Sequence, residues 1–214
     1  MTHSNQVEIR NKNGNGTDIL FYDIDSSRYV NLTNACTLGC KFCPKNQRSF
    51  VVHDYNLSLS QNYPAQTYIE NIGDPANFSE IVFCGFGEPT IRLTELLKIA
   101  AFIKEIGGQT RINTDGLANL VHKRNVLPDM HGVIDALSVS LNAQDEQTYN
   151  LHCAPNLAGS FSAMLSFLEQ APNYIPCVTA TAIDGLPGVN IEECEKLAHS
   201  LGVKFRRRYL DLVG

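Results

Sequence analysis

The chain has 214 residues, 43% of them hydrophobic, and a net charge of −5, which is enough length for one domain with a full core. The mild negative charge gives no electrostatic reason to expect binding to nucleic acid or an anionic membrane, and no apolar run approaches the roughly 20 residues that cross a bilayer. The N-terminal residues lack the plan of a signal peptide, and seven cysteines without a disulfide-rich pattern indicate a reducing compartment, so we expect a cytoplasmic protein.

The first 28 residues are expected to form a flexible or hairpin lead-in to a core domain that covers residues 29–214. The segment up to Thr17 is polar and glycine-rich and has no apolar period. Residues 19–22 and 29–32 are two β-prone runs separated by a short polar turn, a pattern that predicts a hairpin. We expect the functional residues to follow this segment.

Three cysteines come next with the spacing C-x3-C-x2-C: Cys36, Cys40 and Cys43. Thiolate is the ligand that iron–sulfur clusters select, and three thiolates leave one iron of a 4Fe–4S cluster open to a ligand that is not protein. We expect Gly39 to permit the sharp backbone path of such a loop. A structural zinc site normally has four protein ligands, and His53 can supply the fourth. The spacing favours an open iron–sulfur site over zinc and over three structural cysteines.

A loop, a helix and a strand are expected after the cysteines. Residues 46–61 show no clear period, which predicts a long loop that can cover a cluster or a substrate. A first helix is expected over residues 64–72. The continuous apolar run 81–84 then predicts a strand that is buried on both faces, with Cys84 as a core residue.

This strand runs directly into Gly85, Phe86, Gly87 and Glu88, followed by a proline. Such a turn leaves backbone groups unpaired, and an incoming ligand can use them as an added strand edge. The Glu88 carboxylate can accept a hydrogen bond from an ammonium group. A glycine-rich turn after a strand is common, so it points to a ligand only in combination with the cysteines.

Strands and helices alternate over the rest of the chain. Helices are expected at residues 93–103, 117–123, 161–169 and 191–201, and strands at residues 110–114, 136–142, 177–183 and 203–210. With the two earlier strands, this pattern gives six β/α units and a parallel sheet with right-handed crossovers. Six units are too few for a closed eight-stranded barrel of about 250 residues. The predicted fold is therefore α/β, a partial open (β/α)6 barrel.

Two of these strands carry polar side chains at alternate positions. Alternation over residues 136–142 points Ser138, Ser140 and Asn142 away from the helices, which suggests a barrel interior that binds a ligand. Alternation on the last strand turns Arg206 and Arg208 to one face. If this face is the inner one, the pair can bind a carboxylate or phosphate of a substrate. If it is the outer one, the charges discourage pairing of a sheet edge.

The cysteine triplet with Phe42 resembles the C-x3-C-x-aromatic-C signature of radical S-adenosylmethionine (SAM) enzymes, and Gly-Phe-Gly-Glu-Pro resembles their Gly-Gly-Glu-Pro motif. With Tyr-Val-Asn-Leu-Thr-Asn, Ile-Asn-Thr-Asp-Gly-Leu and Ser-Val-Ser-Leu-Asn-Ala, the chain is similar to the small TatD-associated radical SAM family over residues 29–209. The resemblance implies a three-quarter TIM-like barrel and a 4Fe–4S cluster on the three cysteines. It implies that SAM is bound by Phe42, Gly85, Phe86, Gly87, Glu88, Asn113, Asp115, Ser138, Ser140 and Asn142.

The resemblance also implies a reaction. Enzymes of this kind reductively cleave SAM to a 5′-deoxyadenosyl radical, which removes hydrogen from a substrate. The implied partners are a flavodoxin or ferredoxin-type reductant, a small-molecule substrate that the sequence does not identify, and a functional link to a TatD-type hydrolase. An activase that installs a glycyl radical on a partner protein is one alternative. A non-catalytic iron–sulfur or zinc protein is another.

Overall fold

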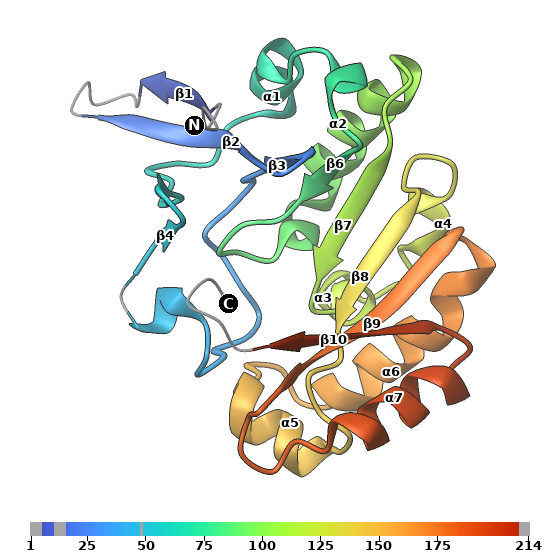
Figure 1. The fold of residues 1–214 in the computed structure, drawn as a ribbon. Coiled ribbons are helices and arrows are strands. Elements are labelled where there is room, and N and C mark those ends of the chain that lie inside the picture. Colours follow the sequence, from blue (N-terminus) through green and yellow to red (C-terminus); the bar gives the residue numbers. More distant parts are fainter. Residues whose placement is uncertain (1–5, 11–15, 48, 210–214) are drawn as a thin grey trace.

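The computed structural model describes residues 6–10, 16–47 and 49–209, which form a curved, open sheet with helices packed along it (Figure 1). The strands of this sheet are β1 (Gln6–Arg10), β2 (Thr17–Ile24), β3 (Ser27–Val30), β6 (Glu80–Phe83), β7 (Thr110–Thr114), β8 (Ala136–Ser140), β9 (Cys177–Asp184) and β10 (Lys204–Tyr209). The α-helices are α1 (Ala65–Asn71), α2 (Leu93–Glu105), α3 (Ala118–His122), α4 (Leu127–Met130), α5 (Glu146–Cys153), α6 (Ser160–Gln170) and α7 (Ile191–Ser200). Within the described ranges, no helix has the length and apolar character needed to cross a membrane.

The order of the strands confirms the predicted topology. The sheet runs β1-β2-β3-β6-β7-β8-β9-β10. All neighbours from β3 to β10 are parallel, whereas β1 and β2 join one edge in antiparallel pairing. The six strands of the predicted β/α units therefore lie side by side in chain order. In the described residues β1 and β10 do not pair, so the sheet stays open as expected.

The core lies between the sheet and its helices. On β8, Leu137 and Val139 are buried on the helix side, which confirms the alternation predicted for this strand. Leu96, Ile99 and Ile103 of α2 recur at helical spacing and are fully buried. Burial of each such side chain contributes about 1.5–3 kcal/mol of transfer free energy. This packing fixes the strands whose carboxyl ends carry the polar residues discussed below.

The predicted N-terminal hairpin is confirmed. β2 pairs with β3, with Ile24 opposite Ser27, and Asp25 adopts a left-handed φ of 53° in the turn. Strand β2 is an integral part of the sheet, since it pairs with both β1 and β3. Of the lead-in predicted over the first 28 residues, residues 1–5 and 11–15 lie outside the described residues.

Phe21 of β2 is expected to contribute strongly to stability, although it precedes the core domain predicted from the sequence. Its side chain is fully buried, and its ring meets Tyr68 of α1 edge to face with the centroids 5.8 Å apart. Phe21→Ala should lower the free energy of unfolding by about 3–5 kcal/mol, measured by urea denaturation. Leu151→Ala is the control, because its side chain is 51% exposed and should change stability by only about 0.5 kcal/mol. Equal effects of the two variants would contradict a structural role for β2.

The sequence does not predict every element. Helix α5 is mostly polar and escapes a search for apolar periodicity, but Asp145 accepts a hydrogen bond from the Thr148 N–H at 2.8 Å as its N-cap. This capping residue is the local signal of its start. The predicted loop 46–61 contains a short hairpin of β4 (Val51–Val52) and β5 (Tyr55–Asn56); its residue 48 lies outside the described residues.

Candidate functional site

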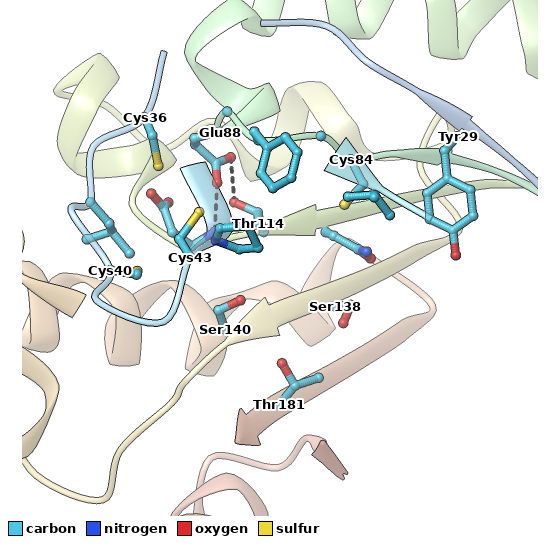
Figure 2. A pocket seen from close by; sticks show the side chains of 18 of the residues that line it. Tyr29, Cys36, Cys40, Cys43, Cys84, Glu88, Thr114, Ser138, Ser140 and Thr181 are labelled. Atoms are coloured by element: carbon cyan, nitrogen blue, oxygen red, sulfur yellow. Dashed lines mark hydrogen bonds between the residues drawn. The ribbon is translucent and has the colours of Figure 1, made fainter. Parts of the chain in front are cut away.

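The carboxyl ends of the parallel strands surround a cavity of about 370 Å³ (Figure 2). This end of a parallel sheet is where such folds bind ligands. Every site residue inferred from the sequence lines the cavity: Cys36, Cys40, Phe42, Cys43, Gly85, Phe86, Gly87, Glu88, Asn113, Asp115, Ser138, Ser140, Asn142, Arg206 and Arg208. The fold thus brings these residues together, while the role of each remains a prediction.

The cysteine loop, residues 33–43, is held against the end of α5. The Gly39 N–H donates to the carbonyl of Cys153 at 3.0 Å, and the Lys41 N–H donates to that of His152 at 2.9 Å. The last carbonyls of a helix have no partner within the helix, so these bonds satisfy the helix end and fix the loop. Gly39 itself has no left-handed φ, and an added Cβ would meet its nearest neighbour at 3.4 Å, an ordinary contact. The path of the loop at Gly39 therefore does not depend on the conformational freedom of glycine.

The other side of the loop rests on the glycine-rich turn. The Glu88 N–H donates to the carbonyl of Ala35 at 2.7 Å. A Cβ on Gly87 would lie 2.1 Å from the carbonyl oxygen of Thr33 and 2.6 Å from that of Ala35, far inside van der Waals contact. Gly87 is needed because the loop backbone passes directly over it. Part of the backbone edge that the sequence assigned to a ligand is thus used by the protein itself.

Phe86, which stands where the motif has its second glycine, packs under the β4–β5 hairpin. Its buried ring meets Phe50 edge to face with the centroids 5.7 Å apart. Leu57 belongs to the same apolar cluster, and both Leu57 and Val52 line the cavity. The segment predicted as a covering loop therefore forms one wall of the cavity.

Cys36, Cys40 and Cys43 are grouped at one end of the cavity (Figure 2), and all seven cysteines of the chain are free thiols. Burial raises the pKa of Cys36 to about 11. Contact with the thiol of Cys153, followed by burial, raises the pKa of Cys40. A metal must therefore displace protons from these thiols when it binds.

The alternative of a zinc site receives no support from this geometry. His53, the candidate fourth ligand, is exposed in the turn between β4 and β5. Across the described residues, no three His, Cys, Asp or Glu side chains are arranged to hold a single metal ion. A zinc ion needs its ligands about 2.0–2.3 Å from one point. The cysteines of an iron–sulfur cluster bind separate irons and do not need to converge in this way.

Glu88 is buried and engaged by four donors. Its Oε1 accepts hydrogen bonds from the Thr90 N–H at 3.0 Å, the Thr90 hydroxyl at 2.6 Å and the Thr114 hydroxyl at 2.8 Å. Its Oε2 accepts one from the Asp115 N–H at 2.7 Å. Burial and then the negative charge of Asp115 raise the pKa of Glu88 to about 8, although the hydrogen bonds act in the opposite direction. The desolvation of the carboxylate therefore outweighs its donors.

Asp115 forms a buried acid pair with Glu88. Its carboxylate accepts hydrogen bonds from the Leu117 N–H at 2.9 Å and from the Thr37 hydroxyl, which ties the end of β7 to the cysteine loop. Burial raises the pKa of Asp115 as well. In the described part of the chain neither acid forms an ion pair. The pair creates a negative region that a cationic group would stabilise.

The inner side of β8 presents polar groups to the cavity. Ser138 and Ser140 line it, and Asn142 follows the strand with a left-handed φ of 61°. The Asn142 N–H donates to the carbonyl of Thr181 at 3.0 Å, while its Oδ1 is buried without a hydrogen-bond partner among the described residues. An unsatisfied buried acceptor costs about 1–3 kcal/mol, so a ligand that donates to Asn142 would recover this energy.

Asn113 reaches the cavity from β7, but its side chain is partly engaged by the protein. Arg111 Nη1 donates to Asn113 Oδ1 at 2.6 Å. The same guanidinium binds both carboxylate oxygens of Glu80, at 2.9 and 2.7 Å. Asn113 is therefore positioned by an ion pair at the deeper end of the strands.

Alternation on β10 turns Arg206 and Arg208 into the cavity and Arg207 outward. Arg206 Nη2 donates to Ser138 Oγ at 3.1 Å. Arg207 pairs with Glu192 on the outside, at 2.9 Å. Of the two alternatives left open by the sequence, the inward orientation of Arg206 and Arg208 is the one observed.

The sequence misses other residues of the site. Tyr22 and Tyr29 line the cavity and stack with their centroids 5.0 Å apart. Cys84, predicted as a core residue, faces the cavity because it stands just after the last residue of β6. Thr181 could be found by alternation on β9, since it lies opposite Arg206 in the register of β10. Cys153 has no local signal; the fold alone brings it beside Cys40.

The family model of the radical SAM superfamily matches residues 30–201 of the chain. Two relatives carry the name dual-specificity RNA methyltransferase RlmN, one from Buchnera aphidicola subsp. Schizaphis graminum (strain Sg) and one from Buchnera aphidicola subsp. Acyrthosiphon pisum (strain APS). They are 25% identical over 150 residues and 26% identical over 141 residues, respectively. These matches cover 65% and 61% of this chain but only 38% and 37% of the relatives.

Solved structures share the fold at low identity. TYW1 with a lysine–pyruvate adduct bound has a TM-score of 0.59 at 14% identity, over 86% of this chain and 64% of that one. SuiB of Streptococcus suis bound to S-adenosylmethionine has a TM-score of 0.60 at 14% identity, over 87% of this chain and 38% of that one. The finer resemblance to the TatD-associated family is not tested by these matches and stays a prediction. By the match over residues 30–201, the chain belongs to the radical SAM superfamily of enzymes, which use a 4Fe–4S cluster and SAM.

Proposed function

We propose that the chain holds a 4Fe–4S cluster on Cys36, Cys40 and Cys43, reductively cleaves SAM there, and removes hydrogen from a small-molecule substrate in the same cavity. The observation that carries the proposal is that three thiols and the buried acid pair of Glu88 and Asp115 line the same end of one cavity. Three thiols suit a cluster with one open iron. The negative charge of the acid pair suits a cationic ligand bound beside the cluster.

The residues around the cysteines fit SAM as the ligand of this cluster. SAM carries an ammonium and a sulfonium group, and the acid pair of Glu88 and Asp115 offers negative charge in a buried setting where such charge interacts strongly. In the part of the chain that the structure describes, Glu88 Oε2 accepts a single hydrogen bond, so it can accept another from the ammonium group. Asn142 Oδ1, Ser138 and Ser140 offer acceptors to the hydroxyl and amino groups of the nucleoside. Phe42 supplies an apolar surface for the adenine.

When bound and reduced by one electron, the cofactors supply methionine and a 5′-deoxyadenosyl radical, which takes a hydrogen atom from a C–H bond of the substrate. The chain's own contribution is to orient the reactants and to keep water from the cavity. The β4–β5 hairpin and Phe86 form an apolar wall for this purpose. The electron would come from a reduced flavodoxin or ferredoxin-type protein.

The RNA named for the two relatives is not proposed as the substrate of this chain. The matches span less than two-fifths of those proteins, and the net charge of −5 gives no overall electrostatic attraction to a phosphate backbone. A glycyl radical activase remains the alternative enzyme. A link to a TatD-type hydrolase also remains a proposal that rests on the family resemblance.

Anaerobic reconstitution with iron and sulfide tests the proposed function. We expect visible absorption typical of a 4Fe–4S cluster, a reduced EPR signal that changes when SAM is added, and formation of 5′-deoxyadenosine under dithionite. A colourless protein that retains zinc after the same treatment would rule out the proposal.

Asp115→Asn is expected to weaken SAM binding about tenfold, the loss of roughly 1.4 kcal/mol of attraction. The amide can keep both hydrogen bonds, because it accepts from Leu117 and the Thr37 hydroxyl can turn to accept from it. In the wild type, SAM affinity should fall as the pH drops below about 8, since protonation of Glu88 removes negative charge. The variant should move this fall to lower pH, because the charge of Asp115 helps to raise the pKa of Glu88.

Isothermal titration calorimetry of the reconstituted protein measures both effects. Asp129→Asn is the matched control, since this carboxylate pairs with Arg124 on the surface, where its side chain is 38% exposed. Asp129→Asn should leave the affinity for SAM, and the dependence of this affinity on pH, as they are in the wild type. An unchanged affinity in Asp115→Asn would show that the acid pair does not attract the cofactor.

A further inference from the structure

The cavity carries opposite charges at its two ends. Glu88 and Asp115 lie at the end near the cysteines, whereas Arg206 and Arg208 line the wall formed by β10. Figure 2 shows Ser138, the partner of Arg206, on the side of the cavity away from the three cysteines. A ligand that fills both ends therefore meets an acidic environment beside the cysteines and a basic one at the wall formed by β10.

The two inward arginines have unused donors. A guanidinium has five N–H donors, and among the described residues the side chain of Arg206 donates only to Ser138 Oγ, from Nη2 at 3.1 Å. Within the described ranges, neither Arg206 nor Arg208 forms an ion pair. Arg207 on the same strand is paired twice on the outside, with Glu192 at 2.9 Å and Asp184 at 3.6 Å.

Glu80, an acid whose charge acts on Arg206, is already engaged by another arginine. Glu80 is bound through both oxygens by Arg111, at 2.9 and 2.7 Å. Burial, followed by the positive charges of Arg111 and Arg208, lowers the pKa of Arg206, so Arg206 and Arg208 repel each other. A bound anion would relieve this repulsion. Planar guanidinium groups match carboxylate and phosphate oxygens especially well.

The position of Arg206 separates it from the cysteines, because its partner Ser138 lies on the side of the cavity away from them. Ser138 precedes Ser140 by two residues on β8, so it lies about 6.6 Å further from the carboxyl end of that strand. Arg206 reaches Ser138 with its side chain, whereas Arg208 stands two residues nearer the carboxyl end of β10. Both arginines line the same cavity as the cysteines, Arg208 half-buried and Arg206 more exposed, so a small anion inside the cavity can reach them.

We infer that Arg206 and Arg208 bind a carboxylate or phosphate group of the substrate, so that the substrate is a small anion held with its charged group away from the cysteines. This inference rests on the proposed function, because it concerns the substrate of the same cavity. The anchored group leaves the remainder of the molecule directed toward the cluster end. Arg206 and Arg208 therefore set which molecules bind and which C–H bond faces the cofactor.

Anion binding to the reconstituted protein tests this inference, with inorganic phosphate and malonate as the probes. Each probe is titrated by calorimetry, with and without SAM, into the wild type, the double variant Arg206→Gln/Arg208→Gln and the control Arg207→Gln. We expect the wild type and the control to bind at least one probe with equal affinity, and the double variant to bind it at least tenfold more weakly. Binding of phosphate alone or malonate alone supports the inference and identifies the group.

The other outcomes overturn the inference. These are no binding of either probe to the wild type, equal binding in the double variant, or an equal loss in Arg207→Gln. SAM affinity is measured in the same samples; a parallel loss of SAM binding in the double variant would assign the arginines to the cofactor instead. Melting temperatures show whether each variant is folded, and Arg206→Lys, which keeps the charge, should retain part of the binding. Failure of the proposed function would appear separately, as a wild type that binds the anion but neither binds nor cleaves SAM.

Discussion

Replacing Cys36, Cys40 or Cys43 by alanine is expected to abolish the iron–sulfur cluster and, with it, the cleavage of SAM. Each thiolate holds one iron of a 4Fe–4S cluster, so each substitution leaves a second iron without a protein ligand. Iron and sulfide content per chain should fall to the background of the reconstitution. Formation of 5′-deoxyadenosine under dithionite should fall below detection in all three variants, because the loss of the cluster removes the electron path to SAM.

Two other cysteines supply the controls for this result. Cys177 begins β9 at the opposite end of the strands, so Cys177→Ala should keep the iron content of the wild type. Cys153 is fully buried beside Cys40, so Cys153→Ala should keep the cluster while lowering stability. Full iron content in any of the three loop variants would contradict the assignment. Loss of iron from a folded Cys153→Ala protein would make Cys153 a fourth ligand and leave no open iron for SAM.

The six parallel strands and their order were predictable because each carries a local signal. Strand β1 was not predicted, because residues 6–10 lie in the polar segment interpreted as a lead-in. Residues 81–84 form an uninterrupted apolar run, and residues 136–142 alternate between apolar and polar side chains, so the faces of β6 and β8 follow directly from the sequence. Helix α5 lacks such a signal, since its buried residues are few and Leu151 points to solvent. The hairpin of β4 and β5 is too short for any period to be recognised.

The members of the site were predictable, whereas their interactions were not. The sequence identifies Glu88 by its motif, but it cannot show that Thr90, Thr114 and the backbone of Asp115 all donate to its carboxylate. It also cannot show which face of β10 turns inward, because Arg206 and Arg207 are chemically identical. Contacts between segments that are distant in the chain decide which groups donate to Glu88 and which face of β10 turns inward.

Glycine at positions 39 and 87 illustrates the same limit. The sequence suggested that Gly39 permits the sharp path of the loop and that the turn containing Gly87 offers its backbone to a ligand. In the structure Gly39 has ordinary backbone geometry, whereas Gly87 lies directly beneath the backbone of Thr33 and Ala35. The requirement for glycine comes from a tertiary contact between the turn and the cysteine loop.

Gly87→Ala is therefore expected to displace the cysteine loop and to prevent assembly of the cluster. The added Cβ would lie 2.1 Å from the carbonyl oxygen of Thr33, and backbone atoms cannot rotate away as a flexible side chain can. Relief of this clash must also strain the hydrogen bond from the Glu88 N–H to Ala35. Overpacking of this kind costs about 1–3 kcal/mol or more. Iron content after reconstitution should fall several-fold, and thermal unfolding should begin at a lower temperature.

Gly39→Ala provides the matched control, because it adds the same methyl group to the same loop. Its Cβ would lie 3.4 Å from the carbonyl oxygen of Ala154 and 3.6 Å from the Cβ of that residue, both ordinary contacts. This variant should bind iron as the wild type does, and its melting temperature should stay close to that of the wild type. If Gly39→Ala lost the cluster while Gly87→Ala kept it, the loop would be held by its own conformation and not by the turn beneath it. Equal and full iron content in both variants would show that the loop adapts to the contact at little cost.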